Sequence, residues 1–203
     1  MAIRPRRSAL YMPGSNARTL EKAKTLAADV VIFDLEDAVA PEAKDLARDQ
    51  VMAAVAGGGY GNRELVVRIN GLDTPWGLTD LARAAEVAPD AILVPKVSSP
   101  SQLITVGQAL APAPEKTRVW AMIETPLAIL NLREIAAAAE DPVTRLSCFV
   151  LGTNDLVKET RAALDENRTA ALFWLSAAVT AARAFGIDVL DGVYNAFRDL
   201  EGF

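Results

Sequence analysis

The 203-residue chain contains no histidine, and this absence narrows its possible chemistry more than any other feature of its composition. Ser-His-Asp and Cys-His catalysis both need an imidazole base, so neither is open to this chain. Metal sites built on histidine are excluded for the same reason. Any proton transfer therefore falls to carboxylates, lysine, tyrosine or a metal-bound water.

Cysteine and long hydrophobic runs are scarce as well. The single cysteine, Cys148, lies within the apolar run CFVLG, so an internal disulfide is excluded and a core position in a reducing compartment is expected. No apolar stretch approaches the ~20 residues of a membrane span, and no signal-peptide pattern opens the chain. These features predict a cytoplasmic protein with no membrane partner.

An excess of basic charge is also lacking, because 21 Lys and Arg face 26 Asp and Glu, for a net charge of −5. This balance gives no reason to expect nucleic acid as a partner. The one basic cluster, Arg4, Arg6 and Arg7, is either a solvated N-terminal arm or an anion-binding site. With 51% hydrophobic and 23% charged residues, the composition is typical of a globular protein, and we expect a single domain over 1–203.

What the chain does contain is a regular alternation of apolar runs and helical patterns. The runs predict parallel strands at 8–12, 30–34, 65–69, 91–95, 119–123, 148–152 and 187–191. Helices are expected after Ser15 or Asn16, after Pro41, after Thr125-Pro126 and over Thr169–Phe185. This order predicts a TIM (β/α)8-type barrel of the α/β class. A doubly wound open sheet is the alternative.

Seven repeats are one short of a closed barrel, since only VYNAFRDLEGF follows Gly192. A missing strand 8 would leave two sheet edges exposed. We therefore expect either a C-terminally truncated chain or another element in the gap. The helix expected over Thr169–Phe185 is apolar nearly all round, which favours burial on two sides, against the barrel and against a second subunit. A homo-oligomer is the corresponding prediction.

Polar side chains crowd the predicted carboxyl ends of the strands, where barrels of this type carry their active sites. In strand order these residues are Tyr11, Pro13 and Gly14; Glu36 and Asp37; Arg68 and Asn70; Lys96; Glu124; and Asp155. The strands were placed by their apolar pattern alone, so this concentration of ionisable groups is an independent indication of an active site.

Glu124 in AMIETP and Asp155 in LGTNDL give the most specific indication of a function. They lie 31 positions apart, the length of one strand–helix–strand unit, so their strands are expected to be parallel neighbours. Adjacent strands run about 4.8 Å apart, so the two carboxylates can hold one hard cation such as Mg²⁺. Arg68 in LVVRIN is suited to bind a substrate carboxylate. The alternative for Asp155 alone is a helix N-cap.

Lys96 in VPKV allows two interpretations. A lysine with apolar neighbours on a barrel strand is what a Schiff-base aldolase uses. The alternative, which the acidic surroundings favour, is pairing with Asp34 or Glu36. The stretch GGGYGN (57–62) precedes a strand and lacks phosphate-loop spacing, so it predicts a turn. PGSNAR (13–18), between a strand end and a helix start, is better placed for an anion.

Six separated segments together resemble the HpcH/HpaI aldolase/citrate lyase family, and its CitE-like branch in particular. That branch comprises citrate lyase β-subunits and the malyl-CoA and citramalyl-CoA lyases. The resemblance covers about residues 7–195. The segments are RSALYMPGSNARTLEKA, DVVIFDLEDAVAPEAKDLAR, VVRIN, LVPKV, IETPLAILNLREIA and LGTNDL.

The resemblance implies a Mg²⁺-dependent carbon–carbon lyase, usually trimeric or hexameric. Such an enzyme cleaves a citryl-, malyl- or citramalyl-type thioester of CoA or an acyl carrier to an oxo acid and an acyl thioester. It assigns the metal to Glu124 and Asp155, the oxo-acid carboxylate to Arg68, and support of metal-bound waters to Glu36 and Asp37. The strand 1 region would lie near the thioester carrier.

Family members typically continue into a GKxxIHP-like strand 8 and a helical lid, which this sequence does not contain. Three alternatives therefore stay open. The chain is a non-catalytic or partner-completed subunit, a malyl-CoA thioesterase, or a Schiff-base aldolase acting through Lys96. For the lyase, elimination leaves a metal-bound hydroxide or a rim carboxylate as the base.

Overall fold

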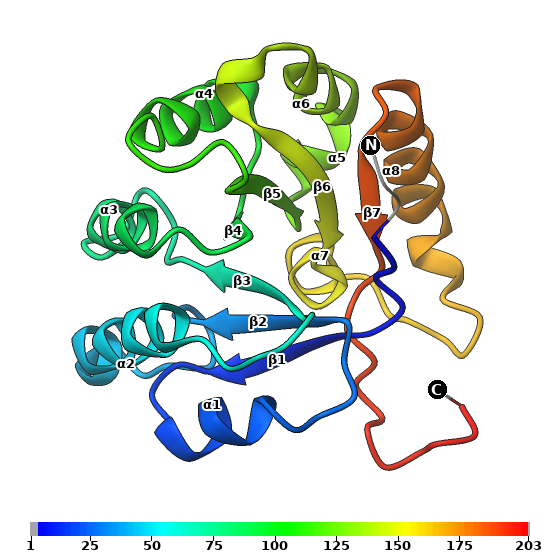
Figure 1. Ribbon diagram of the computed structural model, residues 1–203. Coiled ribbons are helices and arrows are strands. Elements are labelled where there is room, and N and C mark those ends of the chain that lie inside the picture. Colours follow the sequence, from blue (N-terminus) through cyan, green and yellow to red (C-terminus); the bar gives the residue numbers. More distant parts are fainter. Residues whose placement is uncertain (1–3, 203) are drawn as a thin grey trace.

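The structure, a computed structural model, describes residues 4–202. Seven parallel strands follow one another in sequence order and curve into an incomplete barrel (Figure 1). They are β1 (Ala9–Pro13), β2 (Val30–Asp34), β3 (Glu64–Arg68), β4 (Ala91–Val94), β5 (Arg118–Ile123), β6 (Leu146–Leu151) and β7 (Asp188–Leu190). A doubly wound sheet reverses its strand order at a switch point, so that alternative is wrong and the barrel-type winding is confirmed.

The strands alternate with helices. The helices are α1 (Ala17–Ala23), α2 (Lys44–Gly57), α3 (Gly77–Val87), α4 (Pro100–Ala109), α5 (Pro126–Leu130), α6 (Leu132–Ala137), α7 (Thr153–Thr160) and α8 (Leu172–Ala184). Most of them lie outside the ring of strands, whereas α7 is drawn within that ring (Figure 1). The predicted caps hold, because Asn16 accepts a hydrogen bond from the backbone of Thr19 and Thr125 accepts one from Ala128. The predicted glycine-rich turn also holds, with positive φ at Gly58, Gly59 and Gly61.

Alternate side chains of each strand enter two different apolar clusters. One set, including Val31, Phe33 and Phe149, packs against the helices. The other set, including Ile32 and Trp120, fills the barrel interior. Because side chains alternate with a period of two, the inward row continues at the carboxyl ends into polar residues. These polar residues are Asp34, Arg68 and Glu124.

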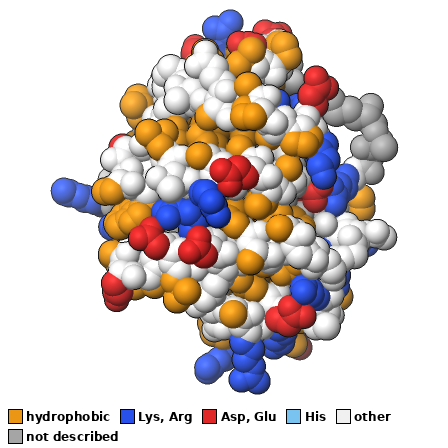
Figure 2. All heavy atoms as spheres, turned by 60° about the vertical axis from the view of Figure 1, so that its left-hand side comes forward, with side chains coloured by type: hydrophobic (Ala, Val, Ile, Leu, Met, Phe, Trp, Pro, Cys, Tyr) orange, Lys and Arg blue, Asp and Glu red, His pale blue; other side chains and the backbone are white. Residues whose placement is uncertain are grey.

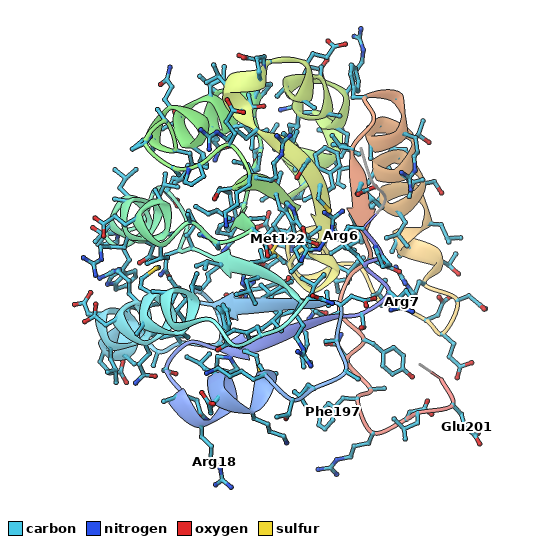
Figure 3. The ribbon with its side chains drawn as sticks, viewed as in Figure 1. Arg6, Arg7, Arg18, Met122, Phe197 and Glu201 are labelled. Atoms are coloured by element: carbon cyan, nitrogen blue, oxygen red, sulfur yellow. The ribbon has the colours of Figure 1, made fainter. Side chains whose placement is uncertain are left out.

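Ion pairs close the opposite, N-terminal end of the barrel interior. Arg6 donates from Nε to Glu64 at 2.6 Å and pairs with Asp188 of β7, and its guanidinium lies 5.0 Å from the centre of the Trp120 ring (Figure 3). Arg7 binds Asp29 at 2.7 Å. The basic cluster is therefore not a free anion site, because its charges are paired within the chain, although the side chain of Arg7 stays exposed to solvent.

Strands β1 and β7 are the two edges of the sheet, as the count of seven repeats predicts. The expectation that α8 is buried on two sides is not met within this chain. Ala178 and Ala182 face the barrel, while Leu172, Phe173 and Val179 are exposed. On the face formed by the outer helices, hydrophobic side chains are scattered among charged ones (Figure 2). No helix within residues 4–202 is long and apolar enough to cross a membrane.

The interior position of Cys148 makes its thiol unreactive. Burial raises the pKa of Cys148 to about 12. With an ordinary thiol pKa of about 8.5, the thiolate fraction at pH 8 falls by about three orders of magnitude on folding. We expect a soluble disulfide reagent to label the native protein about 1000-fold more slowly than the urea-unfolded chain. Rapid labelling of the native protein would place Cys148 outside the interior.

Candidate active site

A cavity of about 360 Å³ opens at the carboxyl ends of the strands. Its lining joins polar and apolar side chains: Tyr11, Asp34, Asp37, Ala38, Arg68, Met122, Glu124, Leu151, Gly152, Thr153, Asn154, Asp155 and Val193. A separate hollow of about 380 Å³ lies against 195–199 and contains none of the predicted site residues. The cavity at the strand ends is therefore the candidate active site.

Arg68 lies at the centre of the acidic side of this cavity. Its Nε and Nη2 bind the two carboxylate oxygens of Asp34 at 2.7 and 2.6 Å. Its Nη1 lies 3.0 Å from Glu36 and 3.2 Å from Asp37. Burial lowers the pKa of Arg68, but the hydrogen bonds and charge of Asp34 outweigh burial and raise it. Asp34 thus occupies one side of the guanidinium, and only Nη1 is directed toward the other carboxylates.

Glu124 is buried at the end of β5, where its Oε1 accepts the backbone N–H of Lys96 at 2.8 Å. Burial raises the pKa of Glu124 to about 8, and the negative charges of Glu36 and Asp155 add to this effect. The carboxylate also needs a glycine beside it. A Cβ at Gly152 would lie 2.5 Å from Glu124 Oε2, so any other residue there would displace the carboxylate.

Asp155 lies in the first turn of α7, and Gly152 occupies the N-cap position. The N-cap alternative for Asp155 is therefore wrong, and its carboxylate lines the cavity that Glu124 also lines. The Nζ of Lys96 connects this side to the Arg68 side, at 3.5 Å from Glu36 and 3.9 Å from Asp155.

The pairing interpretation of Lys96 is confirmed for Glu36. Burial lowers the pKa of Lys96, but the charges of Glu36 and Asp155 outweigh burial and raise it. An amine with a raised pKa is protonated at neutral pH and is a poor nucleophile. The backbone of Lys96 has φ of 54°, a left-handed value that is rare outside glycine and is common at functional sites.

Five predicted site residues are not among those that line the cavity. Glu36 and Lys96 contact the lining residues Arg68 and Asp155 through ion pairs, and the other three are Asn70, Gly14 and Pro13. Asn70 is turned away, because its side-chain amide donates to the buried Asp80 at 2.6 Å. Gly14 supports the site through its backbone, donating to the carbonyl of Asp34 at 2.8 Å, and Pro13 ends β1 beside it. At PGSNAR, the Asn16 side chain accepts the backbone N–H of Thr19 in the short helix α1, and the anion site stays a prediction.

The sequence reasoning missed several residues of the cavity. Asp34 and Met122 belong to the inward rows of β2 and β5, so strict alternation along those strands could have found them. Val193 had no such signal, because it follows β7 in an irregular segment. That segment is held by Asp191, which binds Arg168 at 2.7 and 2.8 Å, and by Asn195, which donates to Asn154 at 2.9 Å.

The acidic groups of the cavity are a donor set that a hard divalent cation can use. Glu36 Oε2 is buried without an aligned hydrogen-bond donor, and the carboxyl of Glu124 is destabilised as an anion. Carboxylate oxygens are the ligands that hard cations take. Within residues 4–202 no three acidic or cysteine side chains form a closed metal site. A cation held by Glu124 and Asp155 would therefore complete its coordination with water or substrate oxygens.

Removing the Arg68 guanidinium should destabilise the fold. The Arg68→Met variant leaves Asp34 buried without its partner, and breaking a buried pair in this way costs about 3–5 kcal/mol. Urea unfolding at pH 7 measures this loss. The exposed pair of Arg83 and Glu86 on α3 supplies the control, since Arg83→Met should cost less than about 1 kcal/mol. Equal effects of the two variants would contradict the role given to Arg68.

Known proteins similar to this chain were found by both sequence and structure. The model of the family described as HpcH/HpaI aldolase/citrate lyase matches residues 7–203. A (3S)-malyl-CoA thioesterase of Cereibacter sphaeroides is 47% identical over 198 residues, covering 98% of this chain and 66% of that protein. The citrate lyase subunit beta of Escherichia coli is 35% identical over 207 residues, covering 98% and 67%. The chain thus spans about two thirds of the length of these curated relatives.

Among solved structures, the protein CitE of Mycobacterium tuberculosis in complex with magnesium and acetoacetate superposes with a TM-score of 0.80 at 32% identity. The superposition covers 100% of this chain and 80% of that one. Another structure of the same protein, with a TM-score of 0.78 at 31% identity, contains magnesium, acetoacetate and coenzyme A and covers 98% and 70%.

Proposed function

Because the chain belongs to the HpcH/HpaI aldolase/citrate lyase family, we propose that it is the catalytic domain of a Mg²⁺-dependent carbon–carbon lyase. Its substrate would be a citryl-, malyl- or citramalyl-type thioester, cleaved to an oxo acid and an acyl thioester. The observation that carries the proposal is that Glu124, Asp155 and Arg68 line one cavity. The magnesium and acetoacetate bound by the CitE relative support the same ligand classes here.

In this proposal, Glu124 and Asp155 would hold Mg²⁺, which would supply Lewis-acid polarisation of the substrate hydroxyl oxygen. Arg68 binds the substrate carboxylate through Nη1, and Asp34 keeps the guanidinium in position. Glu36 or Asp37 accepts the hydroxyl proton, directly or through a water. Burial raises the pKa of Glu36, so its carboxylate is a stronger base than an exposed one. The carbon–carbon bond then breaks to give the oxo acid and a thioester enolate, which takes up a proton.

A second candidate is a malyl-CoA thioesterase, favoured by the 47% identity to the Cereibacter sphaeroides enzyme. The same cation and Arg68 would bind the malyl group, and water would attack the thioester carbonyl instead of the carbon–carbon bond breaking. The products would be malate and a free thiol. The two candidates therefore share a binding site and differ in the bond that is broken.

The partners in this proposal are a small carboxylic acid and a thioester of CoA or an acyl carrier protein. The CitE structure that contains coenzyme A supports CoA. We also propose a trimeric or hexameric homo-oligomer in the cytoplasm, in which the exposed side chains Leu172, Phe173 and Val179 of α8 become covered.

The decisive experiment is incubation of full-length protein with Mg²⁺ and malyl-, citramalyl- or citryl-CoA. A lyase releases an oxo acid, which phenylhydrazine traps, and a thioesterase releases a free thiol, which a disulfide reagent detects. We expect Glu124→Ala and Asp155→Ala each to lower kcat/KM about 1000-fold, because each removes a metal ligand, and EDTA to abolish turnover. The exposed carboxylate of Glu86 on α3 gives the control, Glu86→Ala, with unchanged turnover.

Other outcomes would favour the remaining alternatives. Turnover that survives EDTA and is trapped by borohydride would overturn the metal-lyase proposal and assign the reaction to Lys96. Binding of Mg²⁺ and an oxo acid without turnover of any thioester would favour a non-catalytic or partner-completed subunit.

A further inference from the structure

The segment 34–38, between β2 and α2, carries three of the acidic groups of the site. One side of its backbone is held by Asp34, whose carboxylate accepts the N–H groups of Glu36 at 2.8 Å and Ala38 at 3.1 Å. These bonds turn the chain immediately after β2. The carbonyl groups of the same turn need separate partners, because a buried carbonyl without a hydrogen bond is costly.

Lys44, the first residue of α2, supplies those partners. Its Nζ donates to the carbonyl of Leu35 at 2.8 Å and to the carbonyl of Glu36 at 2.7 Å. The side chain is buried, and its ammonium lies 5.5 Å from the centre of the Trp76 ring. Among the described residues, no carboxylate lies within ion-pairing distance of this ammonium. The lysine therefore binds the backbone of the acidic turn, whereas the carboxylates of the turn pair with Arg68 and Lys96.

We propose that Lys44 is a positioning residue that holds Glu36 and Asp37 toward the cavity. The turn is fixed on its N–H side by Asp34 and on its carbonyl side by Lys44, so the two carboxylates face Arg68 Nη1 at 3.0 and 3.2 Å. An ammonium is suited to this task because it can donate to two carbonyls at once. The inference rests on the proposed function, in which these carboxylates accept the substrate proton.

The charge of Lys44 is buried, so its hydrogen bonds must offset the cost of removing the ammonium from water. Burying a charge is expensive unless it is hydrogen-bonded. Burial lowers the pKa of Lys44, against the opposing charges of Asp34, Glu36, Asp80 and Asp37. A purely packing role would be met at lower cost by methionine, which has a similar length.

The test compares Lys44→Met and Lys44→Arg, with Lys116→Met as a matched control at an exposed position on the opposite rim. Lys44→Met removes both donors and should lower kcat about 10- to 100-fold, with KM changed by less than about threefold, because Arg68 and the metal ligands stay in place. Lys44→Arg keeps donors for the carbonyls and should recover kcat to within about tenfold of the natural protein. Lys116→Met should match the natural protein.

A second measurement does not depend on turnover. Amide hydrogen exchange at Glu36 and Ala38 should be at least about tenfold faster in Lys44→Met, while exchange within β2 stays unchanged. If the natural protein turns over no thioester but this local change is seen, the proposed function fails and the positioning by Lys44 stands.

Two results would overturn the inference. One is unchanged exchange at Glu36 and Ala38 with unchanged kcat. The other is a uniform rise of exchange across the chain, with no rescue by Lys44→Arg, which would mean that Lys44 only stabilises the fold. If Lys44→Met does not fold, Lys44→Gln, which keeps one donor group, takes its place in both measurements with the same expected direction.

Discussion

The guanidinium of Arg68 is the group on which the site depends, because it is the buried positive charge shared by three carboxylates. Asp34 binds it on two nitrogens, and Glu36 and Asp37 approach the third. Carboxylates this close would repel one another without a cation between them. The ion pair of Arg68 and Asp34 also joins the ends of β2 and β3, so the stability of the fold and the shape of the cavity depend on the same hydrogen bonds. A buried pair of this kind adds little net stability, but removing one partner is costly because the other charge is then buried alone.

Much of this arrangement follows from two periodicities that the sequence displays. Apolar runs separated by helical patterns predicted the seven parallel strands and their order, and the structure confirms both. Alternation within a strand then determines which residue at each carboxyl end faces inward. Glu124 continues the row of Trp120 and Met122, and Arg68 continues that of Val66. The positions of Glu124 and Arg68 could therefore be predicted without knowledge of any loop.

Loop residues were predicted less well, because their side chains are oriented by partners distant in sequence. Asn70 has an amide side chain of the kind that often binds ligands, but this amide donates to the buried Asp80 on α3. Lys44 gives no sign in the sequence that its ammonium reaches back to two carbonyls before α2. Lys96 was recognised as a paired lysine, but its backbone contact to Glu124 depends on a left-handed conformation that only the fold determines.

The two ends of the barrel interior use the same kinds of residue for opposite purposes. At the N-terminal end, Glu64 pairs with Arg4 and Arg6, and Asp188 pairs with Arg6 and Arg183, so the acidic groups there are matched by basic ones. At the carboxyl end, acidic groups exceed the basic ones, and burial raises the pKa of Glu124 to about 8. Paired charges at the N-terminal end stabilise the fold, whereas the excess of acidic groups at the carboxyl end can bind a cation. The excess of acidic groups at the carboxyl ends of the strands, which the N-terminal end lacks, is the physical reason to place the active site there.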